Sequence, residues 1–157
     1  MKRLGEIIMA DDNGNDVSLV SYALREAGLN NPVQWIKDGN TLLHYLRQNQ
    51  LLKQMPLLVV MDWNMPGTNT IEILKWIRSQ PEYLNALIAV LTGSENPVQK
   101  QQAYEAGANW HIVKSAAFSD LAELIRRIEV FWTPDNLVSD LNKADGPQFV
   151  LPNTIGF

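Results

Sequence analysis

The sequence contains no cysteine, and this absence excludes several kinds of functional site at once. Without a thiol among its 157 residues, the chain has no disulfide, no thiolate nucleophile, no iron–sulfur cluster and no cysteine-bound zinc. The absence of cysteine also fits a reducing compartment.

Long apolar runs and basic clusters are missing as well. The N-terminal segment has four consecutive apolar residues, 7–10, before two aspartates, which is too short for the apolar region of a signal peptide. No run approaches the roughly 18 residues of a membrane span. The net charge is −4 and no more than two basic residues are adjacent, whereas nucleic-acid binding needs a basic surface. We therefore expect a cytoplasmic protein that binds neither membranes nor nucleic acid.

Short apolar runs alternate with stretches of helical periodicity five times along the chain. The runs that predict strands are 7–10, 33–36, 57–61, 88–91 and 111–113. The helical stretches follow each run, and the second contains Leu42, Leu43, Leu46 and Leu51. Five βα units in series predict an α/β fold, a flavodoxin-like (βα)5 doubly wound parallel sheet with strand order 2-1-3-4-5.

The last part of the chain departs from this alternation. The final predicted helix runs from Phe118 to Phe131, and Pro134 ends it. Residues 134–157 are rich in Asp, Asn, Pro and Gly. We predict one domain over 1–133 and a C-terminal tail over 134–157.

Chemically active side chains stand where the predicted strands end, and ligands bind at this edge of open parallel sheets. Asp11 and Asp12 follow the first strand, and Asp62 ends the third, its neighbour in the predicted order. Three carboxylates this close repel one another unless a cation lies among them or some are protonated. A divalent ion with oxygen ligands, Mg²⁺, is the natural partner.

Two further strand ends complete a site suited to phosphoryl transfer. Thr92, followed by Gly93, ends the fourth strand, and Lys114 ends the fifth. Asp62 would attack phosphorus and become an aspartyl phosphate. Mg²⁺ and Lys114 would neutralise the oxygens of the transferred group.

Taken in order, these segments resemble the receiver domains of two-component response regulators. The resemblance covers about residues 5–133 and rests on four pieces: Asp11-Asp12, Asp62-Trp-Asn-Met-Pro-Gly67, Thr92-Gly93 and Lys114. It implies that Asp62 is the phosphoacceptor. Asp11, Asp12, Asp62 and the backbone carbonyl of Asn64 would be the ligands of Mg²⁺.

The same resemblance gives roles to three residues and reveals two departures. Thr92 would turn its hydroxyl to the phosphoryl group, and Lys114 would pair with the phosphate or with Asp62. The switch position, usually Tyr or Phe, is His111 here, and Ser115 replaces the usual proline after the lysine. A titratable ring at the switch position could alter the switch.

A narrower likeness comes from the C-terminal part of the domain. Lys114-Ser115, with Phe131-Trp132 at the end of the last predicted helix, is similar to the single-domain regulators that partner bacterial phytochromes. The likeness implies a histidine kinase as donor, in this subgroup a bacterial phytochrome. It also implies a homodimer formed through helix 4, strand 5 and helix 5.

Two other functions were weighed against this one. A phosphate-independent, receiver-like interaction module stays open as an alternative. An aspartate-nucleophile phosphatase needs a second Asp two residues after the nucleophile, and Asn64 stands there. Nucleotide or flavin binding also lacks support, because no glycine-rich phosphate loop follows the first strand. We therefore expect a phosphoaccepting signalling protein rather than an enzyme, with its output passed on through protein contacts.

Overall fold

The fold was analysed in a computed structural model, which describes residues 6–26, 28 and 30–114. Its elements are β1 (Ile7–Ala10), α1 (Gly14–Glu26), β2 (Val33–Ile36), α2 (Gly39–Leu52), β3 (Leu58–Asp62), α3 (Thr70–Ser79), the 3₁₀ turn η1 (Pro81–Tyr83), β4 (Leu87–Thr92), α4 (Pro97–Ala106) and β5 (Trp110–Val113). The helix predicted over 118–131 and the tail over 134–157 lie outside the described residues. None of the helices described here has the length and apolarity needed to cross a membrane.

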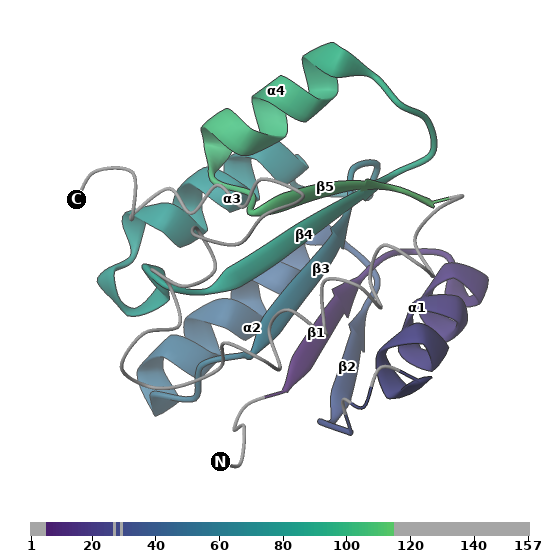
Figure 1. Cartoon of the computed structure of the whole chain (residues 1–157). Coiled ribbons are helices and arrows are strands. Elements are labelled where there is room, and N and C mark those ends of the chain that lie inside the picture. The colour runs from purple at the N-terminus through teal and green to yellow at the C-terminus, as the bar shows by residue number, and fades with distance from the viewer. Residues whose placement is uncertain (1–5, 27, 29, 115–157) are drawn as a thin grey trace.

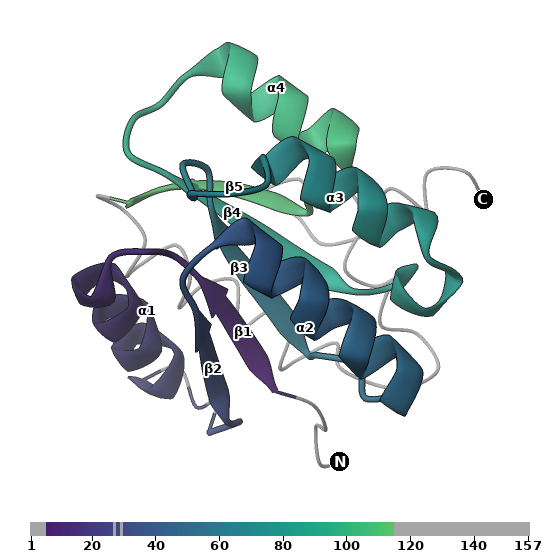
Figure 2. The same cartoon turned by 180° about the vertical axis from the view of Figure 1, so that it is seen from behind.

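The five strands form one parallel sheet in the order β2-β1-β3-β4-β5, as predicted. In Figure 1, α1 lies on one face of this sheet. Figure 2, seen from behind, shows α2, α3 and α4 side by side on the opposite face. The predicted doubly wound fold is therefore confirmed for the part of the chain that the structure describes.

The core follows from the apolar runs, because β3 and β4 are buried along their whole length. Successive strand residues point to opposite faces, so one set packs against α2, α3 and α4 while the other set lies on the α1 side. The first set forms a continuous core with helical side chains such as Leu42, Leu46 and Leu74. The edge strand β2 is largely exposed.

One leucine of the predicted second helix lies in that helix but outside the core. Leu51 is 83% exposed. The buried positions of α2 are Gly39, Leu42, Leu46 and Asn49, which are spaced at i, i+3, i+7 and i+10 along one helical face. Leu51 lies in α2, as predicted, but falls beyond this stripe and contributes little to the core.

Three helices begin with a side chain that caps their backbone N–H groups, immediately after a loop from the sheet. Asp38 accepts from the Thr41 N–H, Asn69 from the Ile71 N–H and Asn96 from the Val98 N–H. Such caps fix where each helix starts. The loops at the carboxyl edge of the sheet are therefore short and well defined, and they carry the polar residues described next.

Candidate functional site

Sheet register brings two of the predicted aspartates side by side. Ala10 of β1 pairs with Met61 of β3, so Asp11 and Asp62 follow on neighbouring strands. Both are buried, with 1% and 5% exposure respectively, whereas Asp12 is exposed. Carboxylate oxygens of Asp11, Asp12 and Asp62 lie within 4.8 Å of one another. The three predicted acidic residues therefore form one cluster.

Lys114, at the end of β5, reaches into this cluster. Its Nζ donates to Asp62 Oδ2 at 3.2 Å and lies 3.6 Å from Asp11 Oδ2. Its shortest contact is to Asp16 Oδ2, at 2.6 Å. Burial alone would lower the pKa of Lys114, but the hydrogen bond that its ammonium group donates to Asp16 and the charges of Asp62 and Asp11 raise this pKa well above its ordinary value. The ammonium group therefore stays charged.

Asp11 places in the cluster a buried carboxylate oxygen that accepts no hydrogen bond from the part of the chain that the structure describes. Its Oδ1 accepts the Asn13 N–H at 2.9 Å, and its Oδ2 is buried without a hydrogen-bond partner among the described residues. Burial raises its pKa from 3.8 to about 6; the Asn13 N–H lowers it, and the charge of Asp62 raises it further. A buried carboxylate oxygen that accepts no hydrogen bond within the described ranges and lies beside two other carboxylates fits a hard divalent cation.

The loop after Asp62 is tied to α3. Asp62 Oδ1 accepts the Asn64 N–H at 3.2 Å, and the Thr70 hydroxyl donates to the backbone carbonyl of Asp62 at 2.9 Å. Asn64 itself is exposed in this loop. These bonds hold Asp62 at the start of the turn, so its carboxylate faces the cluster on a fixed backbone.

The hydrogen bonds of Thr92 and His111 go to residues other than the three carboxylates. The Thr92 hydroxyl is 3.2 Å from Gln99 Oε1 and 3.3 Å from the Ser94 carbonyl, so it points to α4. His111 is half-buried, and its backbone N–H donates to the Tyr104 hydroxyl at 3.2 Å. Burial, and then the charge of Lys100, lower the pKa of His111.

Three residues of the site were missed by the sequence reasoning. Asp16 suggested no more than an acid in the first turn of a helix, which is favourable for the helix dipole alone. Thr70, eight residues after Asp62, carried no signal of its own. Trp35 lies within a predicted strand, and its position alone gave no sign of a role at the site. A hint for Asp16 was available, because the start of α1 lies at the same edge of the sheet as the strand ends.

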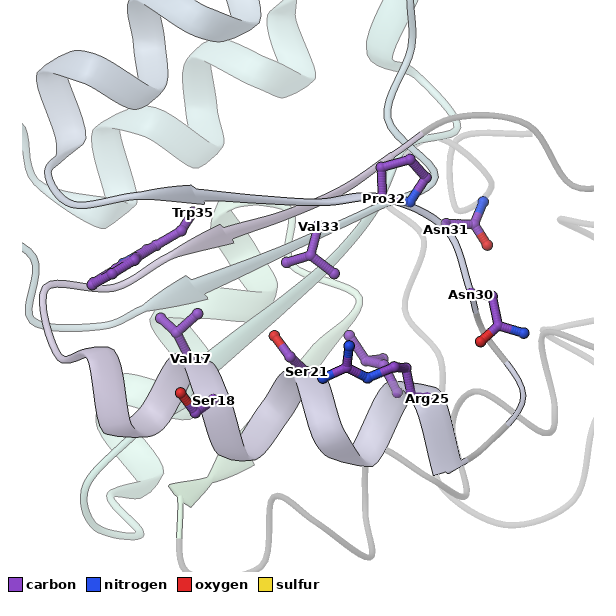
Figure 3. A pocket seen from close by; sticks show the side chains of 10 residues that line it. Val17, Ser18, Ser21, Arg25, Asn30, Asn31, Pro32, Val33 and Trp35 are labelled. Atoms are coloured by element: carbon purple, nitrogen blue, oxygen red, sulfur yellow. The ribbon is translucent and has the colours of Figure 1, made fainter.

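Trp35 supports the turn that carries Asp11. Its indole N–H donates to the backbone carbonyl of Asp11 at 2.7 Å, and Lys37 Nζ lies 4.8 Å from the centre of its ring. A Cβ on Gly14 would come within 3.1 Å of the ring, so the start of α1 packs closely on the indole. Trp35 also lines a groove of about 550 Å³ between α1 and β2, shown in Figure 3, where Val33 lies beside it on the strand side.

Trp35→Phe is expected to weaken divalent-metal binding about fivefold. Phenylalanine keeps an aromatic ring at this position but removes one neutral hydrogen bond, worth about 1 kcal/mol, from the Asp11 carbonyl. Titration with Mn²⁺ followed by electron paramagnetic resonance gives the affinity directly. Trp76→Phe, on α3, serves as the control, and equal affinities in the two variants would contradict this role.

Buried carboxylates lie at the carboxyl edge of a parallel sheet, with a lysine among them. This arrangement on a doubly wound fold is the kind of acidic site that suits phosphoryl transfer. The response regulator receiver domain family matches residues 7–126. The chain therefore belongs to the response regulator receiver domain family, and the predicted resemblance is confirmed. Receiver domains are signalling proteins that accept phosphoryl groups from histidine kinases and bind a divalent metal in an acidic pocket.

Two characterised relatives and two solved structures agree with this assignment. Chemotaxis protein CheY-3 of Vibrio cholerae is 33% identical, with 78% of this chain and 90% of CheY-3 covered. Response regulator Rcp1 of Synechocystis is 27% identical over 80% of this chain and 87% of its own. The Mn²⁺-bound form of Rcp1 superposes with a TM-score of 0.65 at 26% identity, covering 83% of this chain and 96% of that one. The phosphorylated cyanobacterial phytochrome response regulator RcpA gives 0.68 at 30% identity, covering 83% and 94%.

Proposed function

We propose that this protein is a single-domain response regulator whose Asp62 accepts the phosphoryl group of a histidine kinase. One observation carries the choice of Asp62: its carboxylate, on the buried central strand β3, is the one that combines a hydrogen bond to Lys114 at 3.2 Å with membership of the three-carboxylate cluster. Asp11, its neighbour, lies 3.6 Å from the same Nζ, beyond hydrogen-bond distance.

The metal of this site is proposed to be Mg²⁺, held by Asp11, Asp12, Asp62 and the backbone carbonyl of Asn64. When bound, Mg²⁺ neutralises negative charge on the phosphoryl oxygens. The buried Oδ2 of Asp11 accepts no hydrogen bond from the described residues, which supports a metal-ligand role for Asp11. The exposure of Asp12 leaves room for water molecules, several of which Mg²⁺ usually retains.

The transfer step uses residues of this chain in distinct ways. An Asp62 carboxylate oxygen forms a bond to phosphorus, while the bond from phosphorus to the kinase histidine nitrogen breaks and its electron pair stays on that nitrogen. Lys114 holds its ammonium group against the phosphoryl oxygens. Thr92 turns its hydroxyl from Gln99 to the phosphoryl group, and His111 follows as the switch residue. Hydrolysis of the aspartyl phosphate on the same site returns the resting state.

The partners, location and domain boundaries of the protein are also part of this proposal. Similarity to Rcp1 and RcpA supports a bacterial phytochrome as the kinase. We place the protein in the cytoplasm, as a homodimer formed through α4, β5 and the helix predicted after β5. The receiver domain is taken as 1–133, with 134–157 as a separate tail.

The decisive experiment is labelling by acetyl phosphate in the presence and absence of Mg²⁺. Intact-mass measurement should show one phosphoryl group per chain with Mg²⁺ and none with excess chelator. Asp62→Asn should remove the label completely, because an amide nitrogen or oxygen is a poor nucleophile at phosphorus. Asp38→Asn, which keeps a good helix cap at another strand end, should label normally.

Two outcomes would favour other interpretations. Normal labelling of Asp62→Asn would show that another residue is the acceptor. Absence of label in the wild type, together with no change in tryptophan fluorescence on adding Mg²⁺ and beryllofluoride, would favour the phosphate-independent interaction module.

A further inference from the structure

We propose that Asp16 is a positioning residue for Lys114, which holds the lysine ammonium group in the resting protein and competes with the phosphoryl group for it. Asp16 lies in the first turn of α1, five residues after Asp11. The proposal rests on the function proposed above, since it concerns the same acceptor site.

The contacts of Lys114 Nζ rank its three carboxylate partners. Asp16 Oδ2 is closest at 2.6 Å, Asp62 Oδ2 follows at 3.2 Å, and Asp11 Oδ2 is at 3.6 Å. Short charge-assisted hydrogen bonds are the stronger ones. In the resting site, the main partner of Lys114 is therefore Asp16, which has not been assigned a part in the chemistry, and Asp62 is second.

The carboxylate partners of Lys114 differ in solvent exposure, which affects how easily each contact breaks. The Asp11 and Asp62 side chains are almost fully buried, whereas Asp16 and Lys114 keep 27% and 26% of their side-chain surface exposed. An aspartate released by the lysine can therefore be solvated at once. Release from Asp16 costs little, which suits a contact that is made in one state and broken in another.

The charge of Asp16 determines whether its removal increases or decreases phosphorylation of Asp62. A phosphoryl group on Asp62 brings negatively charged oxygens to the ammonium group that Asp16 already holds. An ammonium group has only three N–H donors, and two of them serve Asp16 and Asp62 in the resting site. Neutralising Asp16 should therefore free Lys114 and favour phosphorylation.

The first test needs no metal or phosphoryl group. In the metal-free protein, the ¹⁵Nζ resonance of Lys114 is compared between wild type and Asp16→Asn by lysine-ammonium nuclear magnetic resonance. Loss of the contact to Asp16 should shift this resonance and speed the exchange of its protons with water. Glu72→Gln, which neutralises an acid in the first turn of α3, should leave it unchanged. An unchanged resonance in Asp16→Asn would overturn the proposal.

The second test measures phosphorylation by acetyl phosphate and the affinity for beryllofluoride, both at saturating Mg²⁺. Asp16→Asn should increase each by about fivefold, the size expected for a partly exposed ion pair, and Asp16→Glu should restore wild-type values. In a Lys114→Met background, Asp16→Asn should have no effect, because its action passes through the lysine.

The outcomes separate this proposal from the one before it. If Asp62→Asn still labels, the acceptor assignment fails, whatever Asp16 does. If labelling depends on Asp62 but Asp16→Asn leaves the rate unchanged or lowers it, the competition proposed for Asp16 is wrong. An effect of Asp16→Asn that persists in Lys114→Met would likewise overturn the lysine as its route.

Discussion

Asp11→Asn is expected to stabilise the metal-free protein at neutral pH and to abolish its stabilisation by Mg²⁺. The side chain of Asp11 is buried beside Asp62, and its Oδ2 has no hydrogen-bond partner in the described part of the chain. Asparagine keeps an oxygen for the Asn13 N–H but removes the buried charge. The same substitution removes a carboxylate that is proposed to bind the metal, so stability and function should change in opposite directions.

The pH dependence follows from the sign of the pKa shift. Burial raises the pKa of Asp11 from 3.8 to about 6, so the unfolded state loses its proton first as pH rises. This group therefore opposes folding above pH 4, and the opposition is complete above pH 6. A shift of about two pH units corresponds to about 3 kcal/mol. Asp11→Asn should gain up to this amount at pH 7.5 and less than about 1 kcal/mol near pH 4.

Urea unfolding at several pH values, with chelator and with Mg²⁺, checks both parts of this expectation. Asp12→Asn is the matched control, because Asp12 is an exposed member of the same cluster. It should weaken Mg²⁺ binding without the large gain in stability. A destabilised Asp11→Asn at pH 7.5 would show that the carboxylate is better solvated than its burial indicates.

Gly39→Ala is expected to lower the free energy of unfolding by about 2–3 kcal/mol, as overpacking against backbone does. Gly39 begins α2, and its N–H donates to the Pro66 carbonyl at 2.9 Å. A Cβ at this position would lie 2.4 Å from the carbonyl oxygen of Thr68. The loop after Asp62 would have to move away, so phosphorylation should slow as well.

Gly93→Ala provides the comparison for this second substitution. A Cβ on Gly93 would have no neighbour within 4 Å, so stability should stay within about 0.5 kcal/mol of the wild type. Chemical denaturation of the two variants side by side measures the difference. Equal stability of both variants would mean that the loop carrying Thr68 yields to the methyl group at no cost.

The sheet and the acidic cluster were predictable because both follow from local patterns. Continuous apolar runs identified β3 and β4, and parallel strands end at one edge of a sheet, which brings Asp11 and Asp62 together. The position of Lys114 followed in the same way from the end of β5. The sequence therefore predicted which strand ends meet without any knowledge of side-chain contacts.

The remaining parts of the site depend on tertiary contacts that no local pattern encodes. Asp16 reaches Lys114 across 98 positions of the chain, and this contact depends on how α1 leaves the sheet. The contact of Gly39 with the Thr68 carbonyl joins two loops, although the segment around Gly39 looks like an ordinary turn. Leu51 lies in its predicted helix, but apolar spacing did not show that its side chain is exposed where α2 runs past the sheet.

The bond between Thr92 and Gln99 links the proposed phosphorylation site to α4. A threonine hydroxyl has a single proton, and in the resting protein that proton lies between the Ser94 carbonyl and the side chain of Gln99 on α4. If the hydroxyl turns to a phosphoryl group on Asp62, Gln99 loses its donor in the same movement. The first turn of α4 then loses its bond to the end of β4, so phosphorylation at the end of β3 would change the contacts of a helix on the surface.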